Sequence, residues 1–507
     1  MDLTSIAAGF SVALSFEALL FCFIGVTIGT FVGALPGIGA LAAISMCLPL
    51  TLYLEPTTAL IMLAGIFYGS QYGSSISSIL INIPGTATAA VTCLDGYPMA
   101  QQGRAGQALF ITAVASFVGG SLAIILLMLF APTLARVSIH FNSADYFSVM
   151  LFALVASSSA GDGSPIKGIS MVLLGIVLGL VGTDVTSGYY RFTFGLFHLT
   201  DGISLVALAM GLFGVVEILN SIGQKYTVRV DPKSITVRGM IPTLSEMRRS
   251  LMPTLRGSFF GSVMGILPGT GATIATFISY IAEKRIAKHP EQFGKGAIEG
   301  VAAPEAANNA AVQAAFIPTL SLGIPGDAVM AILLGAMLLH GVTPGPQLIS
   351  EHPDMFWGLV ASFWVGNVLL LVLNIPLIGI WVRLLSIPYY VLYPAMLFFI
   401  CIGVFSIRGS TFDVAVCVVA GVLGYALTAM RYPIVPLLLG FILGPMIEEN
   451  FRRTMLISAG NPSVLVERPI SAVFLSLSLL ILLAPPLLKT IGGVPRLSRG
   501  KRRKTSV

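Results

Sequence analysis

Two twelve-residue stretches decide the fold: GTFVGALPGIGA at residues 29–40 and GSVMGILPGTGA at residues 261–272. Both fit the pattern G-x-x-x-G-x-L-P-G-x-G-A, and they lie 232 residues apart. Each belongs to an apolar stretch in which proline interrupts helical hydrogen bonding and glycine permits backbone conformations closed to other residues. At membrane depth such a break survives only where it is buried in protein or lines a wet cavity. The pair therefore predicts an internal repeat built around broken helices.

A second proline-glycine break follows in each half of the chain. YGSSISSILINIPGT at residues 72–86 aligns with QAAFIPTLSLGIPGD at residues 313–327, so that the two Ile-Pro-Gly motifs correspond. Glycine-rich membrane sequence can produce one such match by chance, but two pairs in the same order make chance a poor explanation. Each half is therefore expected to carry two breaks, as re-entrant hairpins or discontinuous helices.

The composition identifies the solvent that this chain must meet. Of its 507 residues, 56% are apolar and only 10% are charged, and the mean hydropathy is +0.92. A soluble domain carries about 25% charged residues, whereas apolar stretches of roughly 20 residues, long enough to cross a bilayer as helices, recur along this chain. These stretches do not alternate with period two, which argues against a β-barrel. The sequence predicts an all-α polytopic membrane protein with roughly 10 to 13 transmembrane helices.

Charge placement orients the two halves. No lysine or arginine precedes Arg104, whereas residues 221–257 carry seven, residues 283–296 carry four and the tail from Lys489 carries seven. Basic loops stay on the cytoplasmic side, so the matching hairpins of the two halves are predicted to face opposite sides of the membrane. This is the inverted-topology repeat of many secondary transporters. It divides the chain into membrane repeat 1 (1–220), a basic cytoplasmic linker (221–250), membrane repeat 2 (251–488) and a basic cytoplasmic tail (489–507), with the N-terminus periplasmic.

The breaks are the candidate substrate and ion site. A helix that restarts after Pro-Gly presents free N–H groups and the positive end of its dipole, which suit a carboxylate. The helix that ends there offers carbonyl oxygens, which suit Na⁺. The predicted ligands are Pro36, Gly37, Gly39, Asn82, Gly85, Thr86, Pro268, Gly269, Thr270, Gly271, Asn308, Asn309, Thr319, Gly326 and Asp327. No metal ligand set is assigned, although a coupling Na⁺ would be expected near Gly37, Gly269 and Asn309. Ser157 and Ser158 lie outside both breaks, and substitutions of these two serines are predicted to have little effect on transport.

Each of these features also has a plainer interpretation. A Pro-Gly break can be a kink that packs against a neighbouring helix, and serines or threonines in a membrane helix often bond their own backbone. Asp327 is harder to dismiss, because a carboxylate inside a membrane is costly and usually functional. Acidic and basic residues at segment ends are expected to form helix-end ion pairs: Asp184, Arg191, Asp201, Glu217, Glu448, Glu449, Arg452 and Arg453.

Enzyme signatures and cofactor motifs are missing from the sequence. Neither Gly-Lys pair is followed by Ser or Thr, so there is no P-loop, and the five histidines form no H-E-x-x-H motif. The five cysteines show no metal-ligand spacing. The basic residues gather in a few loops, which does not indicate nucleic-acid binding. The chain is predicted to be neither an enzyme nor a cofactor protein.

Over almost its whole length the chain resembles the large membrane subunit of the tripartite tricarboxylate transporters. The resemblance is carried by both L-P-G-x-G-A breaks, by NIPGT (82–86), PEAANNAAVQAAFIPTLSLGIPG (304–326), RFTFG…LTDGI (191–203) and YPIVPLLLGFILGPMIEENFRR (432–453). It implies a multi-pass protein of the bacterial inner membrane that imports small carboxylates, driven by a gradient of Na⁺ or H⁺. It also implies two partners, a small four-helix membrane subunit and a periplasmic solute-binding protein.

Two other interpretations stay open at this point. A self-sufficient carrier or channel would share the breaks but would need no binding protein. An intramembrane enzyme would need a nucleophile and a base placed together. The resemblance implies a tri- or dicarboxylate as substrate, of which citrate is one candidate, and leaves the choice between Na⁺ and H⁺ open.

Overall fold

A computed structural model of the chain describes residues 3–35, 39–138, 140–160, 165–184, 186–221, 237–267, 271–384 and 389–491. Five predicted ligands lie outside these ranges: Pro36, Gly37, Pro268, Gly269 and Thr270. Half of the predicted linker, residues 222–236, and nearly all of the predicted basic tail also lie outside them.

The first half of the described chain is helical apart from one short hairpin. Its elements are α1 (Leu3–Ala13), α2 (Phe16–Ala34), α3 (Gly39–Thr51), α4 (Pro56–Ile81), η1 (Ala87–Ala90), α5 (Thr92–Gln101), α6 (Ala105–Ser138), α7 (Ser143–Ala160), α8 (Pro165–Gly179), β1 (Gly182–Thr183), β2 (Tyr190–Arg191), η2 (Phe197–Leu199), α9 (Leu205–Ala209), η3 (Met210–Val215) and α10 (Val216–Ser221). The strands β1 and β2 pair antiparallel, and η3 is a turn of π-helix.

The described part of the second half contains helices and loops only. Its elements are α11 (Val237–Met240), α12 (Leu244–Ile266), α13 (Gly271–Ile286), η5 (Pro290–Gln292), α14 (Glu299–Ala314), α15 (Phe316–Leu322), α16 (Ala328–Leu339), α17 (Pro346–Glu351), α18 (Pro353–Asn374), α19 (Ile378–Leu384), α20 (Tyr389–Arg408), α21 (Thr411–Ala429), α22 (Val435–Ile457), α23 (Val464–Glu467) and α24 (Pro469–Ile491). The predicted all-α class is confirmed. Helix α12 begins at Leu244, inside the stretch predicted as a linker.

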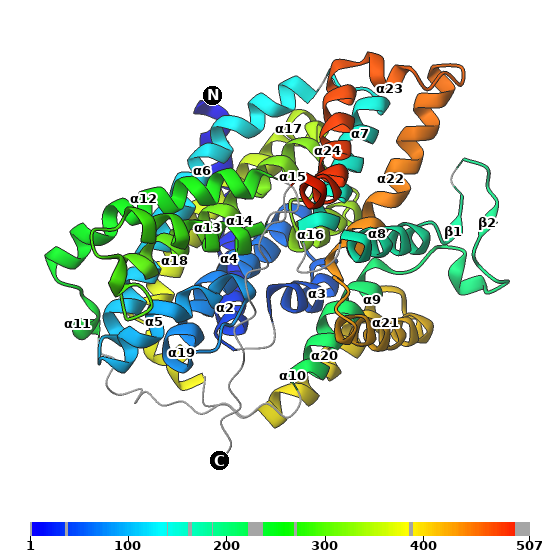
Figure 1. Cartoon of the computed structure of the whole chain (residues 1–507). Coiled ribbons are helices and arrows are strands. Elements are labelled where there is room, and N and C mark those ends of the chain that lie inside the picture. The colour runs from blue at the N-terminus through cyan, green and yellow to red at the C-terminus, as the bar shows by residue number, and fades with distance from the viewer. Residues whose placement is uncertain are drawn as a thin grey trace.

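The helices form two groups joined by α3 and α16. In Figure 1 one group, with α2, α4, α5, α6, α12, α13, α14 and α18, lies to the left, and the other, with α7 to α10 and α20 to α24, lies to the right. Helix α3 packs against α4 of the first group and against η3, α9 and α20 of the second. Helix α16 contacts α4 and α3, and also α22 of the second group.

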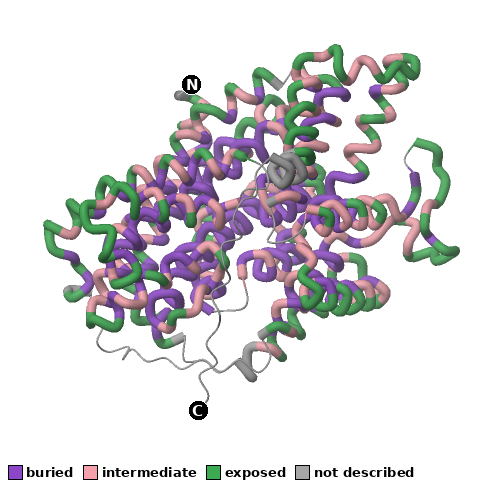
Figure 2. The backbone as a smooth tube through the Cα atoms, viewed as in Figure 1, coloured by how far each residue is buried: buried purple, intermediate pink, exposed green. Residues whose placement is uncertain are grey.

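Three of the longer described helices are buried on every face. In Figure 2 the purple, buried residues gather in the interior, and they include almost all of α4, α14 and α16. A helix that is apolar or buried all round belongs to the core of a large protein or membrane bundle. The polar side chains on α4 and α14 are therefore held among other protein groups.

Glycine stripes hold α2 against α4 and α12 against α14. A methyl group added at Gly25, Gly29 or Gly33 of α2 would overlap the carbonyl oxygen of Met62, Ile66 or Ser70, respectively. In the second half, Gly257, Gly261 and Gly265 lie in the same way over Ala303, Ala307 and Ala311. Small residues at four-residue spacing let helix backbones approach closely in a membrane. In each half the residue numbers rise together along both helices, so the two helices of each pair run parallel.

Four described helices are long and apolar enough to cross a bilayer, by length and composition. They are α2, α6 (over Ala105–Val137), α18 and α21. Seven further apolar helices are shorter, between 10 and 17 residues. Short apolar helices are what broken or re-entrant segments produce. The figure of 10 to 13 crossings stays a prediction.

Candidate functional site

A cavity of about 750 Å³ lies where the two helix groups meet. Both proline-glycine breaks of each half contribute to its wall, together with α4, α14 and the second helix group. The lining includes Gly39–Ala42, Phe67, Gln71, Pro84–Thr88, Ser157, Leu212, Phe213, Val216, Glu217, Asn220, Gly271–Ile274, Val312, Gly326–Val329, Thr428, Pro433–Pro436 and Leu439. Its volume falls in the range of about 300–1,000 Å³ found for small-molecule sites.

Helices α3 and α13 begin at the cavity wall. Their first residues, Gly39 and Gly271, have φ of 65° and 62°, and no heavy atom lies within 4 Å of where a side chain would start. Only glycine adopts this left-handed backbone without strain. Each helix therefore presents its unpaired N–H groups and the positive end of its dipole to open space, the usual arrangement for binding an anion.

The second break of each half supplies polar side chains. Thr86 and Thr88 share a hydrogen bond of 2.8 Å, and the Thr88 hydroxyl donates to Gln71 Oε1 at 2.8 Å. Asp327 is the N-cap of α16, and its Oδ1 accepts a bond from the Met330 N–H at 2.9 Å. The carboxylate of Asp327 therefore offsets the positive end of α16.

The wall facing the breaks comes from the second helix group. Leu212 and Phe213 belong to the π-helical turn η3, and Glu217 follows on α10. π-Helical turns within α-helices are often found at functional sites. Among the described residues that line the cavity, Asp327 and Glu217 are the only charged ones, and both are acidic. An anion in this cavity would be held by backbone N–H groups and hydroxyls, and not by lysine or arginine from the described lining.

The structure brings together six of the predicted ligands and separates four others. Gly39, Gly85, Thr86, Gly271, Gly326 and Asp327 line the cavity, whereas Asn82, Asn308, Asn309 and Thr319 do not. Asn82 ends α4 in the left-handed conformation, which Gly323 adopts at the end of α15. The Thr319 hydroxyl donates to the carbonyl oxygens of Ala315 and Ile324 at 2.8 and 3.2 Å.

Comparisons with known proteins identify the family. Residues 19–439 match the Tripartite tricarboxylate transporter TctA family. The chain belongs to this family. It is 49% identical over 480 residues to the uncharacterized 52.8 kDa protein in the TAR-I ttuC′ 3′ region of Agrobacterium vitis, covering 94% of this chain and 95% of that protein. It is 53% identical over 219 residues to the uncharacterized protein in the TAR-II ttuC′ 3′ region of the same organism, covering 43% of this chain and 90% of that protein. No solved structure matches the chain.

Membership of the TctA family makes this chain the large membrane subunit of a tripartite tricarboxylate transporter, and not an enzyme. Within the described ranges, no three His, Cys, Asp or Glu side chains are grouped so that they could hold a metal ion.

Sequence reasoning missed three residues of this TctA protein. Glu217 is predicted above to form a helix-end ion pair, but it lines the cavity. Ser157, predicted to be silent, also lines the cavity and cannot serve as a control, whereas the Ser158 hydroxyl bonds the Val155 carbonyl at 2.7 Å. Glu305 lies in the quoted stretch 304–326 but was not singled out. For Glu217 and Glu305, the sequence feature that could have revealed them is a single carboxylate within a run of small or apolar residues.

Four of the residues predicted to form helix-end ion pairs do form them. Arg191 contacts Glu448 at 2.9 Å and Asp184 at 3.4 Å, and Arg452 contacts Glu448 at 2.6 Å and Asp184 at 3.1 Å. This network ties the β1–β2 hairpin to α22, so the structure confirms the ion-pair interpretation for these four residues.

Proposed function

We propose that this chain is the translocation subunit of a binding-protein-dependent secondary transporter. It imports small carboxylates, of the tri- or dicarboxylate class, and is driven by a gradient of H⁺ or Na⁺. The observation that carries the proposal is the convergence of the α3 and α13 N-termini, at Gly39 and Gly271, on one cavity. Because each N-terminus carries about half a positive charge, two of them suit a substrate with more than one carboxylate.

The acidic side chains in the wall support coupling to a cation. An anionic substrate entering this cavity meets the carboxylates of Asp327 and Glu217. Like charges in a poorly solvated site repel strongly, and each buried ion also costs several kcal/mol of desolvation. A cation or proton that enters with the substrate removes part of both costs. Substrate and cation are therefore expected to bind cooperatively.

The family supports the proposed partners, and the basic-residue asymmetry supports the proposed orientation. A small four-helix membrane subunit and a periplasmic solute-binding protein would complete the system in the bacterial inner membrane. A receptor that raises the local substrate concentration can load a site of weak intrinsic affinity. Residues 1–16 would face the periplasm and residues 501–504 the cytoplasm, with the two halves in inverted orientation.

Uptake by reconstituted vesicles tests this proposal. The chain is reconstituted alone, with the small subunit, and with both the small subunit and the binding protein, and accumulation of radiolabelled citrate and succinate is followed. We expect accumulation only in the complete system and only with an inward H⁺ or Na⁺ gradient. Saturable accumulation by the chain alone would support a self-sufficient carrier and would contradict the proposal.

A further inference from the structure

One carboxylate lies inside the helical core, away from the cavity wall. Glu305, on α14, is 1% exposed. Ser75 of α4 donates to its Oε2 at 2.7 Å, Ser116 of α6 donates to the same oxygen at 3.4 Å, and Thr92 of α5 donates to its Oε1. Three other helices thus each present one hydroxyl to this carboxylate.

Among the described residues, no basic side chain forms an ion pair with Glu305. Within the described part of the chain, every ion pair involves other acidic residues. A buried ionised carboxylate without a cation is costly, even when it accepts hydrogen bonds. Hydroxyl groups can both donate and accept, so this shell can solvate Glu305 as a carboxylate and as a carboxylic acid. Such a shell suits a group that changes its protonation state.

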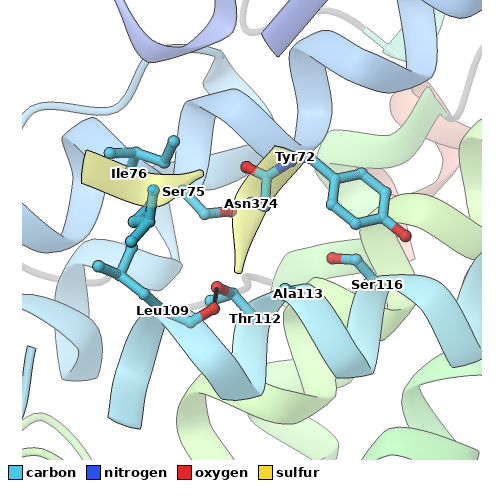
Figure 3. Close-up of a pocket in the computed structure, with 9 residues that line it drawn as sticks. Tyr72, Ser75, Ile76, Leu109, Thr112, Ala113, Ser116 and Asn374 are labelled. Carbon is cyan, nitrogen blue, oxygen red and sulfur yellow. Dashed lines mark hydrogen bonds between the residues drawn. The ribbon is translucent and has the colours of Figure 1, made fainter. Parts of the chain in front are cut away.

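A cavity of water size lies beside two of these hydroxyls, those of Ser75 and Ser116. It has a volume of about 10 Å³, enough for one water molecule, and Ser75, Thr112, Ser116 and Asn374 line it. Figure 3 shows Ser75 from α4 facing Thr112 and Ser116 from α6 across this space. Two of the three hydroxyls that reach Glu305 therefore also border a site for one water.

The Glu305 cluster lies next to the large cavity. Ser75 is one helical turn, about 5.4 Å, beyond Gln71 of the cavity wall on α4. Thr92 likewise follows Thr88 of the wall by four residues, along the η1–α5 segment. The Thr88 hydroxyl also donates to Gln71. A movement of Gln71 or Thr88 in the cavity wall therefore acts on a residue only four positions away from a hydrogen-bond partner of Glu305.

We propose that Glu305 takes up and releases the coupling proton of the transport cycle, an inference that rests on the function proposed above. In the ionised state the hydroxyls of Ser75, Thr92 and Ser116 donate to the carboxylate. A proton arriving through water in the small cavity is taken up by Ser116 Oγ as Ser116 passes its own proton to Glu305 Oε2, which forms an O–H bond there. That O–H then donates to Ser116, whose own O–H turns toward the water. Release reverses these moves, so one proton is gained and lost and no other bond is broken.

Asn309 positions this relay. Its Nδ2 donates to Ser116 Oγ at 2.7 Å and to the Glu305 carbonyl at 3.3 Å. One lone pair of Ser116 is thereby occupied and its hydroxyl is aimed between the carboxylate and the small cavity. Asn309, predicted from sequence to bind substrate or cation, would then act through Ser116.

The geometry favours a proton over Na⁺ as the ion carried. The Ser75 hydroxyl is in direct hydrogen-bond contact with the carboxylate, at 2.7 Å, and Thr92 also bonds it directly. A metal ion would have to separate these oxygens in order to bind between them. A proton needs no additional space.

The other titratable groups around Glu305 are few. Helix α4 contributes Tyr72, which donates to Asn367, and α5 contributes Cys93 and Asp95. Helices α12 and α13 contribute the Arg256–Glu283 pair and Tyr280, which donates to Asp95. Glu299 on α14 pairs with Arg249, and α6 has no titratable residue before Arg136. Asp95 also accepts three backbone N–H bonds, so its role is to hold the loop before α14.

Infrared difference spectroscopy tests the protonation of Glu305 without requiring transport. The purified full chain is titrated with pH, and the carbonyl stretch of a protonated carboxylic acid is followed. We expect a band that disappears as pH rises and that is absent from Glu305→Gln but present in Asp95→Asn, an equally buried carboxylate. If no titrating band is assignable to Glu305, or if Glu305→Gln keeps the full wild-type set of bands, the proposal fails.

Transport by the complete three-component system tests the coupling. Glutamine resembles the protonated glutamate but cannot release a proton. Glu305→Gln should therefore lose citrate or succinate accumulation driven by a pH gradient, while exchange of labelled for unlabelled substrate continues at the wild-type rate. Ser75→Ala and Ser116→Ala should reduce pH-driven accumulation. Ser78→Ala should not, because the buried Ser78 hydroxyl donates to the carbonyl oxygens of Ser74 and Ala89 and not to Glu305.

The outcomes separate this inference from the proposed function. If the wild-type system accumulates carboxylate but Glu305→Gln does so equally, the function stands and the role of Glu305 is wrong. If accumulation depends on a Na⁺ gradient and is unaffected by a protonophore, the assignment of a proton as the coupling ion is wrong. If the wild-type system accumulates nothing, the proposed function is wrong, and the infrared titration still decides whether Glu305 binds a proton.

Discussion

The helix pair α2–α4 in the first half and the pair α12–α14 in the second have the same backbone arrangement but different side chains. Three glycines in each pair lie over three backbone carbonyls in the same register. Gly39 and Gly271 start α3 and α13 with nearly equal φ, and Asn82 and Gly323 end α4 and α15 in the same left-handed conformation. The features that shape the backbone are thus present twice.

The side chains at matching positions differ in chemistry. In this register Phe67 and Gln71 of α4 match Asn308 and Val312 of α14, and Thr86 matches Asp327. Glu305 matches Ala64, and two of its hydroxyl partners, Ser75 and Thr92, come from the first half. The comparison indicates that the repeated backbone builds the cavity, whereas the carboxylates at the matched positions, Asp327 and Glu305, belong to the second half only.

The largest effect is expected from filling the glycine stripes. Gly33→Ala or Gly265→Ala places a methyl group against a backbone carbonyl, of Ser70 or Ala311, that cannot move without separating two core helices. Overpacking typically costs about 1–3 kcal/mol and occasionally more, and a clash with backbone belongs at the upper end of this range. We expect both variants to lose the cooperative thermal transition of the purified protein in detergent.

The control for the stripes is Gly379→Ala on α19. Gly379 is exposed, and no atom lies within 4 Å of an added methyl group. Alanine is the better helix former by up to about 1 kcal/mol, so this variant should melt at or above the wild-type temperature. If Gly265→Ala melts normally while Gly33→Ala does not, the two pairs are not packed alike and the comparison between the halves is broken.

The next largest effect concerns the paired helix starts. Gly39→Val and Gly271→Val should both abolish carboxylate uptake by the complete system, because their side chains project into the cavity from a left-handed backbone. Gly103→Val is the matched control, since Gly103 also has positive φ, at 78°, and open space around it, but lies outside the cavity lining. Strain of about 1–2 kcal/mol is common to all three variants.

The amount of folded protein in the membrane is measured for each variant. This measurement distinguishes loss of transport caused by backbone strain from loss caused by filling the cavity. All three variants should insert to similar extents, and only Gly103→Val should transport. Normal uptake by Gly271→Val alongside failure of Gly39→Val would mean that a single helix terminus holds the substrate.

The sequence predicted the backbone of this protein better than its side-chain chemistry. The Pro-Gly breaks located the cavity because proline and glycine act on local backbone geometry, wherever the rest of the chain lies. Glu217 was assigned to a helix end, because sequence alone does not show that η3 and α10 pack against the breaks of both halves. Glu305 was overlooked because its partners, Ser75, Thr92 and Ser116, come from three other helices.

A smaller effect separates the two second breaks. Asp327→Asn removes a charge from the cavity but keeps the N-cap of α16, because asparagine caps as well as aspartate. The factor by which saturating cation raises carboxylate affinity should fall by about tenfold, a coupling loss of roughly 1.4 kcal/mol. Carboxylate binding to the purified complex, compared at low and high pH and at low and high Na⁺ concentration, measures this factor for either cation.

The matching variant in the first half is Thr86→Val. It removes a hydroxyl that bonds Thr88 but no charge. Loss of one hydrogen bond, about 1 kcal/mol, should weaken carboxylate binding by roughly fivefold, equally with and without the cation. If Thr86→Val lowered the factor by which the cation raises carboxylate affinity and Asp327→Asn did not, the coupling between cation and carboxylate would reside in the first half and not at Asp327.

The smallest effect is expected at the β1–β2 hairpin, which has no strand counterpart in the described second half. The Ser187 hydroxyl and the Thr186 N–H donate to Asp184, and with Arg452 and Arg191 they lower its pKa from 3.8 to about 2. The depressed pKa means that Asp184 stabilises the hairpin fully above about pH 3.8 and loses this contribution as pH falls through about 2.

Hydrogen exchange of residues 182–191, compared between pH 5 and pH 2 after correction for the intrinsic exchange rate, should show protection falling in this window. Asp184→Asn should have low protection at both pH values, because asparagine has no charge to lose. A wild-type hairpin that stays protected down to pH 2 would show that packing against α22, and not the ion pairs, holds this feature of the first half in place.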